Sequence, residues 1–151
     1  LDVIAEVVRL LADEVEWVFF GMCTDEIRPW LHEYHDSVTL DAYPAKLASL
    51  NLDLALAPLE PHRFNECKSH LKLLEYGVLG YPVIATDIRT YAGDYPITRV
   101  GKNTDEWVDA IREHLASPAK SAARGGELRD YVLKNWMLED NLRVWTAAWM
   151  P

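Results

Sequence analysis

The sequence predicts an α/β domain in which a parallel sheet lies between two layers of helices. Short stretches rich in Val, Ile and aromatic residues alternate with amphipathic helical patterns, and the connections between them are short. Half of the 151 residues are hydrophobic, which is enough for one buried core. Strands joined in this way pair in parallel through right-handed crossovers, and ligands of such sheets bind beyond the carboxyl ends of the strands.

The first half of the chain alternates between helical and strand patterns. From Leu1 onward, Ile4, Val8 and Leu11 recur at helical spacing, with charged residues on the opposite side. Continuous apolar strands are typical of a sheet covered on both faces. Two such strands occur in this half of the chain, and the first ends at Gly21 and the second at Pro58. The elements expected are a helix over 1–14, a strand over 15–21, a proline-interrupted helix over 24–34, a strand over 37–40, a helix over 44–50 and a strand over 52–59.

The second half continues the alternation and ends in helices. A helix over 104–117 is expected to have Thr104 as its N-cap and to bury Trp107, Ile111 and Leu115. The other elements expected are a helix over 67–79 that stops at Gly80, strands over 82–86 and 97–101, and helices over 118–151 that break near Gly125–Gly126 and near Asn135.

Charge and cysteine content exclude several classes of function. Lys and Arg number 15 against 24 Asp and Glu, a net charge of −9, which argues against nucleic acid or an anionic membrane as the main partner. Cys23 and Cys67 form neither a disulfide framework nor a C-x-x-C pair, so a reducing, cytoplasmic setting is expected. No apolar run approaches the ~18 residues of a membrane span. The chain opens inside a helical pattern without an initiating Met, so we expect it to be a piece of a longer protein.

A basic cluster stands out in the acidic chain, in the segment PHRFNECKSHLKLLEYGVLGYPVIAT (residues 61–86). On a helix over 67–79, Lys68, Lys72 and Glu75 share one narrow stripe, while both flanks are apolar. A largely buried helix seldom carries a charged stripe without a partner for it. The same spacing also fits a solvated face with an ion pair worth ~0.3–0.5 kcal/mol, and both interpretations remain open on spacing alone.

The expected start of this helix resembles an anion site. Asn65 can cap it, which leaves the backbone N–H groups of residues 66–69 without helical partners, and Lys68 and the Ser69 hydroxyl would add to them. A diphosphate is the natural ligand of such a group of donors. Glu75 would lie ~10 Å further along, where a carboxylate can accept hydrogen bonds from ribose hydroxyls.

The stretch NECKSHLKLLEYGVLGYPVIATD (residues 65–87) resembles the nucleotide-sugar-binding motif in the C-terminal domain of GT-B glycosyltransferases. The similarity is to glycosyltransferase family 4 (glycosyl transferases group 1), and outside this motif it is one of layout over nearly the whole chain. The positions in register are Lys68, Ser69, Lys72, Glu75, Tyr76, Gly80, Pro82, Val83, Ala85, Thr86 and Asp87.

The resemblance implies a Rossmann-like nucleotide-sugar-binding domain over residues 1–151, with terminal helices over about 118–151. The catalytic residues would be Lys68, which stabilises the departing diphosphate, and Glu75, which holds the ribose. The implied donor site comprises His62, Arg63, Asn65, Glu66, Cys67, Lys68, Ser69, Lys72 and Glu75, with Gly21, Ala42 and Tyr43 on the side of the base.

The implied activity is retaining transfer of a sugar from a nucleoside-diphosphate sugar to an acceptor, in polysaccharide or cell-envelope glycan synthesis. No metal or other cofactor is expected, because the helix dipole and basic side chains offset the diphosphate charge. The glycan or lipid-linked acceptor would bind to an absent N-terminal domain, so this chain alone should be inactive. A cytoplasmic protein is expected, with a peripheral position at the inner face of the membrane as an alternative for the full-length protein.

One position departs from the family pattern. Many members carry a second glutamate eight residues before the first, and here that position is Cys67, while Glu66 is one place too early. Either the loop shifts so that Glu66 serves, or Lys68 replaces the carboxylate, and we prefer the second. The departure also leaves open a non-catalytic interaction module, and the shared architecture leaves open a GT-B type epimerase.

Other candidate sites are weaker. His32 and His35 could be a metal pair, but no third ligand of matching spacing accompanies them, and a surface loop is favoured. Cys67 lacks a positioned base for nucleophilic catalysis, and a single Gly after the first strand excludes a nicotinamide-type G-x-G-x-x-G motif. His62 and Arg63 fit a sugar or phosphate contact and plain exposure equally well.

Three tryptophans lie in the last helices. Trp136, Trp145 and Trp149 fit core packing, which is favoured, or docking against another domain.

Overall fold

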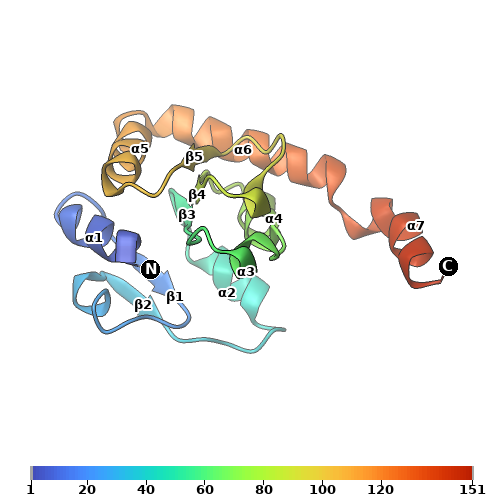
Figure 1. Cartoon of the computed structure of the whole chain (residues 1–151), viewed down its shortest axis with the longest axis horizontal. Coiled ribbons are helices and arrows are strands. Elements are labelled where there is room, and N and C mark those ends of the chain that lie inside the picture. Colours follow the sequence, from blue (N-terminus) through green and yellow to red (C-terminus); the bar gives the residue numbers. More distant parts are fainter. Residues whose placement is uncertain (1, 151) are drawn as a thin grey trace.

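The computed structural model describes residues 2–150 and has the predicted α/β architecture (Figure 1). Leu1 and Pro151, which belong to the first and last expected elements, lie outside the described residues. Along the chain the elements are α1 (Asp2–Leu10), β1 (Val18–Phe20), the 3-10 helix η1 (Arg28–Trp30), β2 (Glu33–His35), α2 (Tyr43–Ser49), β3 (Ala55–Ala57), α3 (Arg63–Glu66), α4 (Leu71–Val78), β4 (Val83–Thr86), the 3-10 helix η2 (Arg89–Tyr91), β5 (Thr98–Val100), α5 (Thr104–Ala116), α6 (Pro118–Asn135) and α7 (Leu138–Trp149).

The strands form two parallel sheets. β1 pairs with β2, and β4 lies between β3 and β5. Side chains along β4 alternate between two cores: Ile84 belongs to the core built with α1 and α5, whereas Val83 and Ala85 belong to the core built with α4 and α6. Because helices bury both faces of this central strand, the prediction of a sheet between two helical layers is confirmed.

The second strand lies earlier than the sequence predicts. The predicted helix over 24–34 and strand over 37–40 are wrong, since only η1 is helical and β2 precedes the predicted strand. The carbonyl of Trp17 accepts hydrogen bonds from the N–H groups of His32 (2.9 Å) and Glu33 (3.0 Å). A three-residue strand has too short a hydrophobic pattern to be identified by period, so pairing with β1 decides where it forms.

α6 runs without a break through Gly125 and Gly126, so the break predicted there is wrong. A Cβ at Gly125 would lie 2.1 Å from the carbonyl oxygen of Gly80 and 2.8 Å from the nitrogen of Pro82. The glycine therefore allows α6 to pack directly on the backbone that leads from α4 into β4, and it does not end the helix. The break predicted near Asn135 is confirmed, because α6 ends at that residue.

The start and inner face of α5 differ slightly from the prediction. The side chain of Asn103 caps the helix by accepting a hydrogen bond from a backbone N–H at 3.0 Å, so Thr104 is the first helical residue and not the cap. Trp107 and Ile111 are buried as predicted, whereas Leu115 is 42% exposed. The predicted helix at Pro44 is present one residue earlier, as α2, and the strands that correspond to β1, β3, β4 and β5 are present with shorter bounds.

α7 lies beyond the end of α6 and away from the strands (Figure 1). Trp145 is 56% exposed, Trp149 is 80% exposed, and Trp136, between the two helices, is 42% exposed. The prediction that these tryptophans pack in the core of the domain is therefore wrong for Trp145 and Trp149. Within residues 2–150, no helix combines the length and the apolar character needed to cross a membrane.

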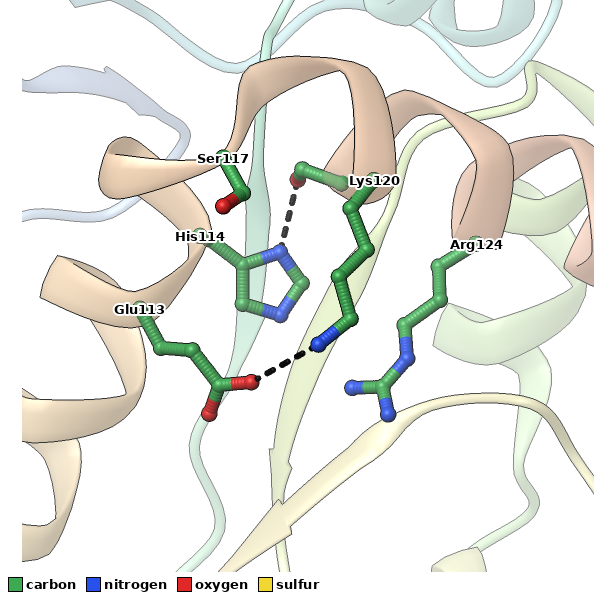
Figure 2. A pocket seen from close by; sticks show the side chains of 6 residues that line it. Glu113, His114, Ser117, Lys120 and Arg124 are labelled. Atoms are coloured by element: carbon green, nitrogen blue, oxygen red, sulfur yellow. Dashed lines mark hydrogen bonds and ion pairs between the residues drawn. The ribbon is translucent and has the colours of Figure 1, made fainter.

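A buried histidine joins β5, α5 and α6. The Nδ1 atom of His114 lies 2.6 Å from the Ser121 hydroxyl, and its Nε2 atom lies 2.9 Å from the Thr98 hydroxyl, which also accepts a hydrogen bond from Arg124 (2.7 Å). The hollow beside it, lined by Lys120 among others, holds about 10 Å³, which is room for one water at most (Figure 2). Burial, assisted by the Arg124 charge, lowers the pKa of His114, so this group is a neutral structural link.

Substitution at the two adjacent glycines of α6 should have opposite effects. Gly125→Ala places a Cβ against backbone that cannot move aside, so we expect a loss of about 2–3 kcal/mol in the free energy of unfolding. Gly126→Ala is the matched control, because open space surrounds that position and alanine favours the helix by about 1 kcal/mol. Chemical denaturation of both variants measures the difference. Equal stability of the two would contradict the close contact of α6 with the α4–β4 connection.

The buried histidine should make stability depend on pH. The unfolded chain binds a proton at His114 near the ordinary pKa of 6.5, whereas the folded chain does so only at lower pH. The free energy of unfolding should therefore rise with pH through this window and lose the His114 contribution as pH falls below 6.5. Urea unfolding between about pH 5 and 8 compares the wild type with His114→Gln, which does not titrate. An identical pH dependence of the two proteins is the contrary outcome.

Candidate functional site

A cleft of about 450 Å³ lies beyond the carboxyl ends of β3, β4 and β5. Its volume is within the range of small-molecule sites. One wall is the loop that follows β3, the floor includes the last residue of β4, and the opposite wall follows β5. The lining residues are Ile4, Pro58, Leu59, Glu60, Pro61, Asn65, Lys68, Thr86, Gly101, Lys102 and Trp107.

The loop after β3 is held in place by hydrogen bonds to the end of β4 and to η2. The N–H of Leu59 donates to the buried hydroxyl of Thr86 at 2.9 Å. The hydroxyl of Thr90 donates to the carbonyl of Asn65, whose side-chain amide donates to the carbonyl of Glu60 at 2.8 Å. The cleft wall is thus fixed on both sides, although it has little regular structure.

The single helix predicted over 67–79 is wrong, because two helices occupy this region. The short α3 is capped by His62, whose Nδ1 accepts from the N–H of Phe64 at 3.2 Å, and α4 starts only after its N-cap, His70. The intervening residues 67–70 form a turn and a bend without regular secondary structure. The sequence pattern of α4 could not show this, since α3 is also held by the Thr90 hydroxyl of η2, which bonds to the Asn65 carbonyl from a distant segment.

This break changes the anion site that the sequence predicts. The N–H groups of Glu66, Cys67 and Lys68 already donate to carbonyls in α3 and its cap, at 3.0–3.2 Å. Asn65 lies inside α3 and does not cap the helix that carries Glu75. The prediction is therefore wrong for the cap and for three of the four backbone N–H donor groups. The unpaired donors of a helix start belong instead to the first turn of α4, where His70 makes no side-chain cap bond.

Lys68 leaves the predicted charged stripe. It lies between α3 and α4, with its ammonium group 5.1 Å from the centroid of the Phe64 ring, and it lines the cleft. Lys72 and Glu75 stay together on α4, with Lys72 Nζ 3.1 Å from Glu75 Oε2. The three charged residues therefore do not share one stripe. Lys68 lines the cleft, and Lys72 and Glu75 form a separate ion pair.

Tyr43 joins this ion pair and makes it a three-residue cluster. Its hydroxyl donates to Glu75 Oε2 at 2.9 Å and accepts from Lys72 Nζ at 2.7 Å, and its ring stacks on Phe20 with centroids 5.3 Å apart. Glu75 Oε2 is therefore held by two donors, while Glu75 Oε1 has no hydrogen-bond partner within residues 2–150. A half-buried carboxylate with one free oxygen can accept a hydroxyl group from a ligand.

The protonation states suit this arrangement. Burial would lower the pKa of Lys72, but its hydrogen bond to Tyr43 and the neighbouring Glu75 charge outweigh that effect, and the pKa is raised. Burial raises the pKa of Tyr43, which keeps its hydroxyl proton available to the carboxylate. The cluster therefore holds an ammonium, a neutral phenol and an acceptor oxygen.

The other predicted donor residues lie around the cleft loop or near β1. Exposed side chains are those of His62, Arg63, Glu66, Cys67 and Ser69. On the predicted base side, the carbonyl of Gly21 accepts from Tyr34 (3.0 Å), and Ala42 is the exposed N-cap of α2. Tyr43 is the one residue of the base side that the structure brings to Glu75.

Sequence inspection missed the wall of the cleft that follows β5. Lys102 comes two residues after the end of β5, and Trp107 comes from the first turns of α5. The rule that ligands lie at the carboxyl ends of parallel strands would have included Lys102, had it been applied to every strand. Ile4 also lines the cleft, and no motif marks it, whereas Glu60 belongs to the loop that follows β3, where the sequence places a ligand.

The histidine pair near β2 has other contacts. His32 Nδ1 accepts from the N–H of Trp17 at 3.1 Å, and His35 pairs with Glu33 at 2.8 Å. In the part of the chain that the structure describes, no three His, Cys, Asp or Glu side chains gather as metal ligands.

Comparison with known proteins agrees with the architecture. No family model matches the chain, and no curated protein matches it in sequence. The parallel sheets flanked by helices match a Rossmann-like domain of the GT-B type. The crystal structure of TarM, a wall teichoic acid glycosyltransferase of that type, is similar to this chain with a TM-score of 0.70 and 17% sequence identity. The similar region covers 99% of this chain and 32% of the TarM chain, so this chain spans about a third of that protein's length. At this identity, the likeness is one of fold.

The hydrogen bond between Thr86 and Leu59 should control the position of the cleft wall. Thr86→Val removes the acceptor and leaves a part-buried N–H unpaired, so we expect a loss of about 1–3 kcal/mol in the free energy of unfolding. Hydrogen exchange at the Leu59 amide should become faster. Thr39→Val, at an exposed threonine away from the cleft, is the control. Unchanged protection of Leu59 would mean that the loop is held by other contacts.

Proposed function

We propose that this chain is the donor-binding part of a glycosyltransferase that moves a sugar from a nucleoside-diphosphate sugar to an acceptor. The observation that carries the proposal is the Glu75 carboxylate, which is fixed by Tyr43 and Lys72 and has one oxygen free, in a domain of the GT-B type. A fixed acceptor of this kind suits the two hydroxyl groups of a ribose. The motif that resembles glycosyltransferase family 4 contains both Lys72 and Glu75.

The cleft supplies the remaining requirements of such a donor. Its apolar wall, which includes Pro58 and Leu59, can contact the flat face of a sugar, and Lys68 brings positive charge to the same space. The diphosphate would lie between the first turn of α4 and Lys68. The hydroxyl of Ser69, next to the helix start, is a further donor within this segment.

The proposed chemistry is electrostatic. As the bond between the anomeric carbon and the phosphate oxygen breaks, negative charge develops on the diphosphate, and the Lys68 ammonium and the N–H groups of α4 stabilise it. The acceptor hydroxyl forms the new bond to the anomeric carbon and gives its proton to the departing phosphate oxygen. In a retaining reaction, the acceptor approaches from the face that the diphosphate leaves.

The proposal also concerns the acceptor and the cellular setting of the reaction. Because the chain spans about a third of TarM, we propose that a glycan or lipid-linked acceptor binds to another part of the full-length protein. Cys23 and Cys67 are both free thiols, which supports a reducing, cytoplasmic compartment. Polysaccharide or cell-envelope glycan synthesis is the pathway class proposed.

Nucleotide binding to the intact protein tests the proposal. UDP or GDP should bind, and Glu75→Gln should weaken binding about 10-fold or more, because a hydrogen bond to a charged acceptor is lost. Glu113→Gln is the matched control, since Glu113 also pairs with a lysine but is exposed and has no hydrogen bond to Tyr43. Isothermal titration calorimetry gives the affinities. Absence of binding of both nucleotides to the intact protein would contradict the proposal.

Turnover assays distinguish the other activities that the fold allows. Incubation with labelled nucleotide sugars should give transfer to an acceptor or slow hydrolysis. Binding without any turnover would identify a non-catalytic module, and isomerised donor without an acceptor would identify an epimerase.

A further inference from the structure

The cleft has a second lysine on the wall opposite Lys68. Lys102 follows β5, whereas Lys68 belongs to the segment that follows β3. β4 lies between these two strands, and Thr86 at its end is part of the cleft. The two lysines therefore line the cleft from opposite sides of the central strand.

Neither of these lysines is neutralised by a neighbouring carboxylate. Within residues 2–150, the ion pairs involve Lys72, Arg112, Lys120 and His35, and none involves Lys68 or Lys102. Glu60 lines the same cleft, but it is not within ion-pair distance of either ammonium. In a chain with a net charge of −9, two uncompensated cations at one cleft favour an anionic ligand there.

The backbone beside Lys102 is fixed by the start of α5. The N–H of Gly101 donates to Glu106 Oε2 at 2.6 Å, and the carbonyl of Gly101 accepts from Trp107 Nε1 at 3.2 Å. A Cβ at Gly101 would lie 2.7 Å from Glu106 Oε2, so a larger residue there would displace that carboxylate. Asn103 then caps α5. The backbone of Lys102, between Gly101 and the cap, is therefore held in place before a ligand binds, which reduces the backbone entropy lost on binding.

We infer that Lys102 binds a phosphate group of the ligand in the cleft, on the side opposite Lys68. The identification of that ligand as a nucleoside diphosphate rests on the proposed function. The phosphate contact itself rests on the two unpaired ammonium groups and on the fixed backbone at Gly101. Lys102 thus supplies positive charge that the 65–87 motif does not contain.

Calorimetry on the intact protein tests this inference with pyrophosphate, UDP and GDP as ligands. Lys102→Ala should weaken binding of pyrophosphate and of the preferred nucleotide about 10-fold, and Lys102→Arg should retain most of the affinity because it keeps the charge. Lys134→Ala, at an exposed lysine of α6 outside the cleft, is the control for net charge and should change affinity less than about 2-fold. Higher salt should reduce the difference between the wild type and Lys102→Ala.

The outcomes separate this inference from the proposed function. Nucleotide binding that depends on Glu75 but is unchanged in Lys102→Ala would overturn the role of Lys102 and leave the function intact. Pyrophosphate binding that depends on Lys102, with no gain from the nucleoside, would support Lys102 and contradict the nucleotide function. An equal loss in Lys134→Ala, or no binding of any of the three ligands to the wild type, would overturn the inference.

Discussion

The complete burial of strand β4 is the constraint on which the domain depends. Its four residues are all buried, it pairs on both edges, and its side chains feed two different helical cores. The chain reaches this strand through Gly80, whose φ of +75° and contact with Gly125 fix the turn out of α4. The strand ends at Thr86, whose hydroxyl holds the cleft loop. One buried element thus positions α4 at its entry and the candidate site at its exit.

The site follows from parallel pairing around that strand. In a parallel sheet all carboxyl ends meet at one edge, so residues that are distant in sequence, such as Glu60, Thr86 and Lys102, line one cleft. The chain as a whole is acidic, so its long-range electrostatic field repels an anion. Positive charge gathered at one cleft is therefore a specific feature of that cleft. Affinity for an anion would then have to come from short-range contacts within the cleft. The proposed function assigns the nucleoside to the fixed Glu75 carboxylate and the phosphates to Lys68 and Lys102.

Local patterns predicted the elements well where the pattern was long, and failed where a distant partner decided. Helices α1 and α5 have strong periodicity and were predicted to within a few residues, whereas β2 is three residues long and forms where β1 allows it. Two adjacent glycines usually indicate a helix break. Here α6 continues through Gly125 and Gly126, and Gly125 is needed for the close contact with Gly80. Large aromatic residues such as Trp145 and Trp149 are usually buried in a core. Both are exposed here, because α7 lies away from the strands.

The sequence by itself determined the fold class, the order of most elements and the pairing of Lys72 with Glu75, because each of these depends on periodicity or on spacing within one helix. Only the tertiary structure decided where α4 begins, since the Thr90 hydroxyl that bonds to the Asn65 carbonyl of α3 comes from a separate segment. It also brought Tyr43 to Glu75 and Lys102 to the cleft of Lys68. The physical reason is the same in each case. A single side chain contributed by a distant strand or loop leaves no periodic signal in the sequence, and its place is set by how the sheet pairs.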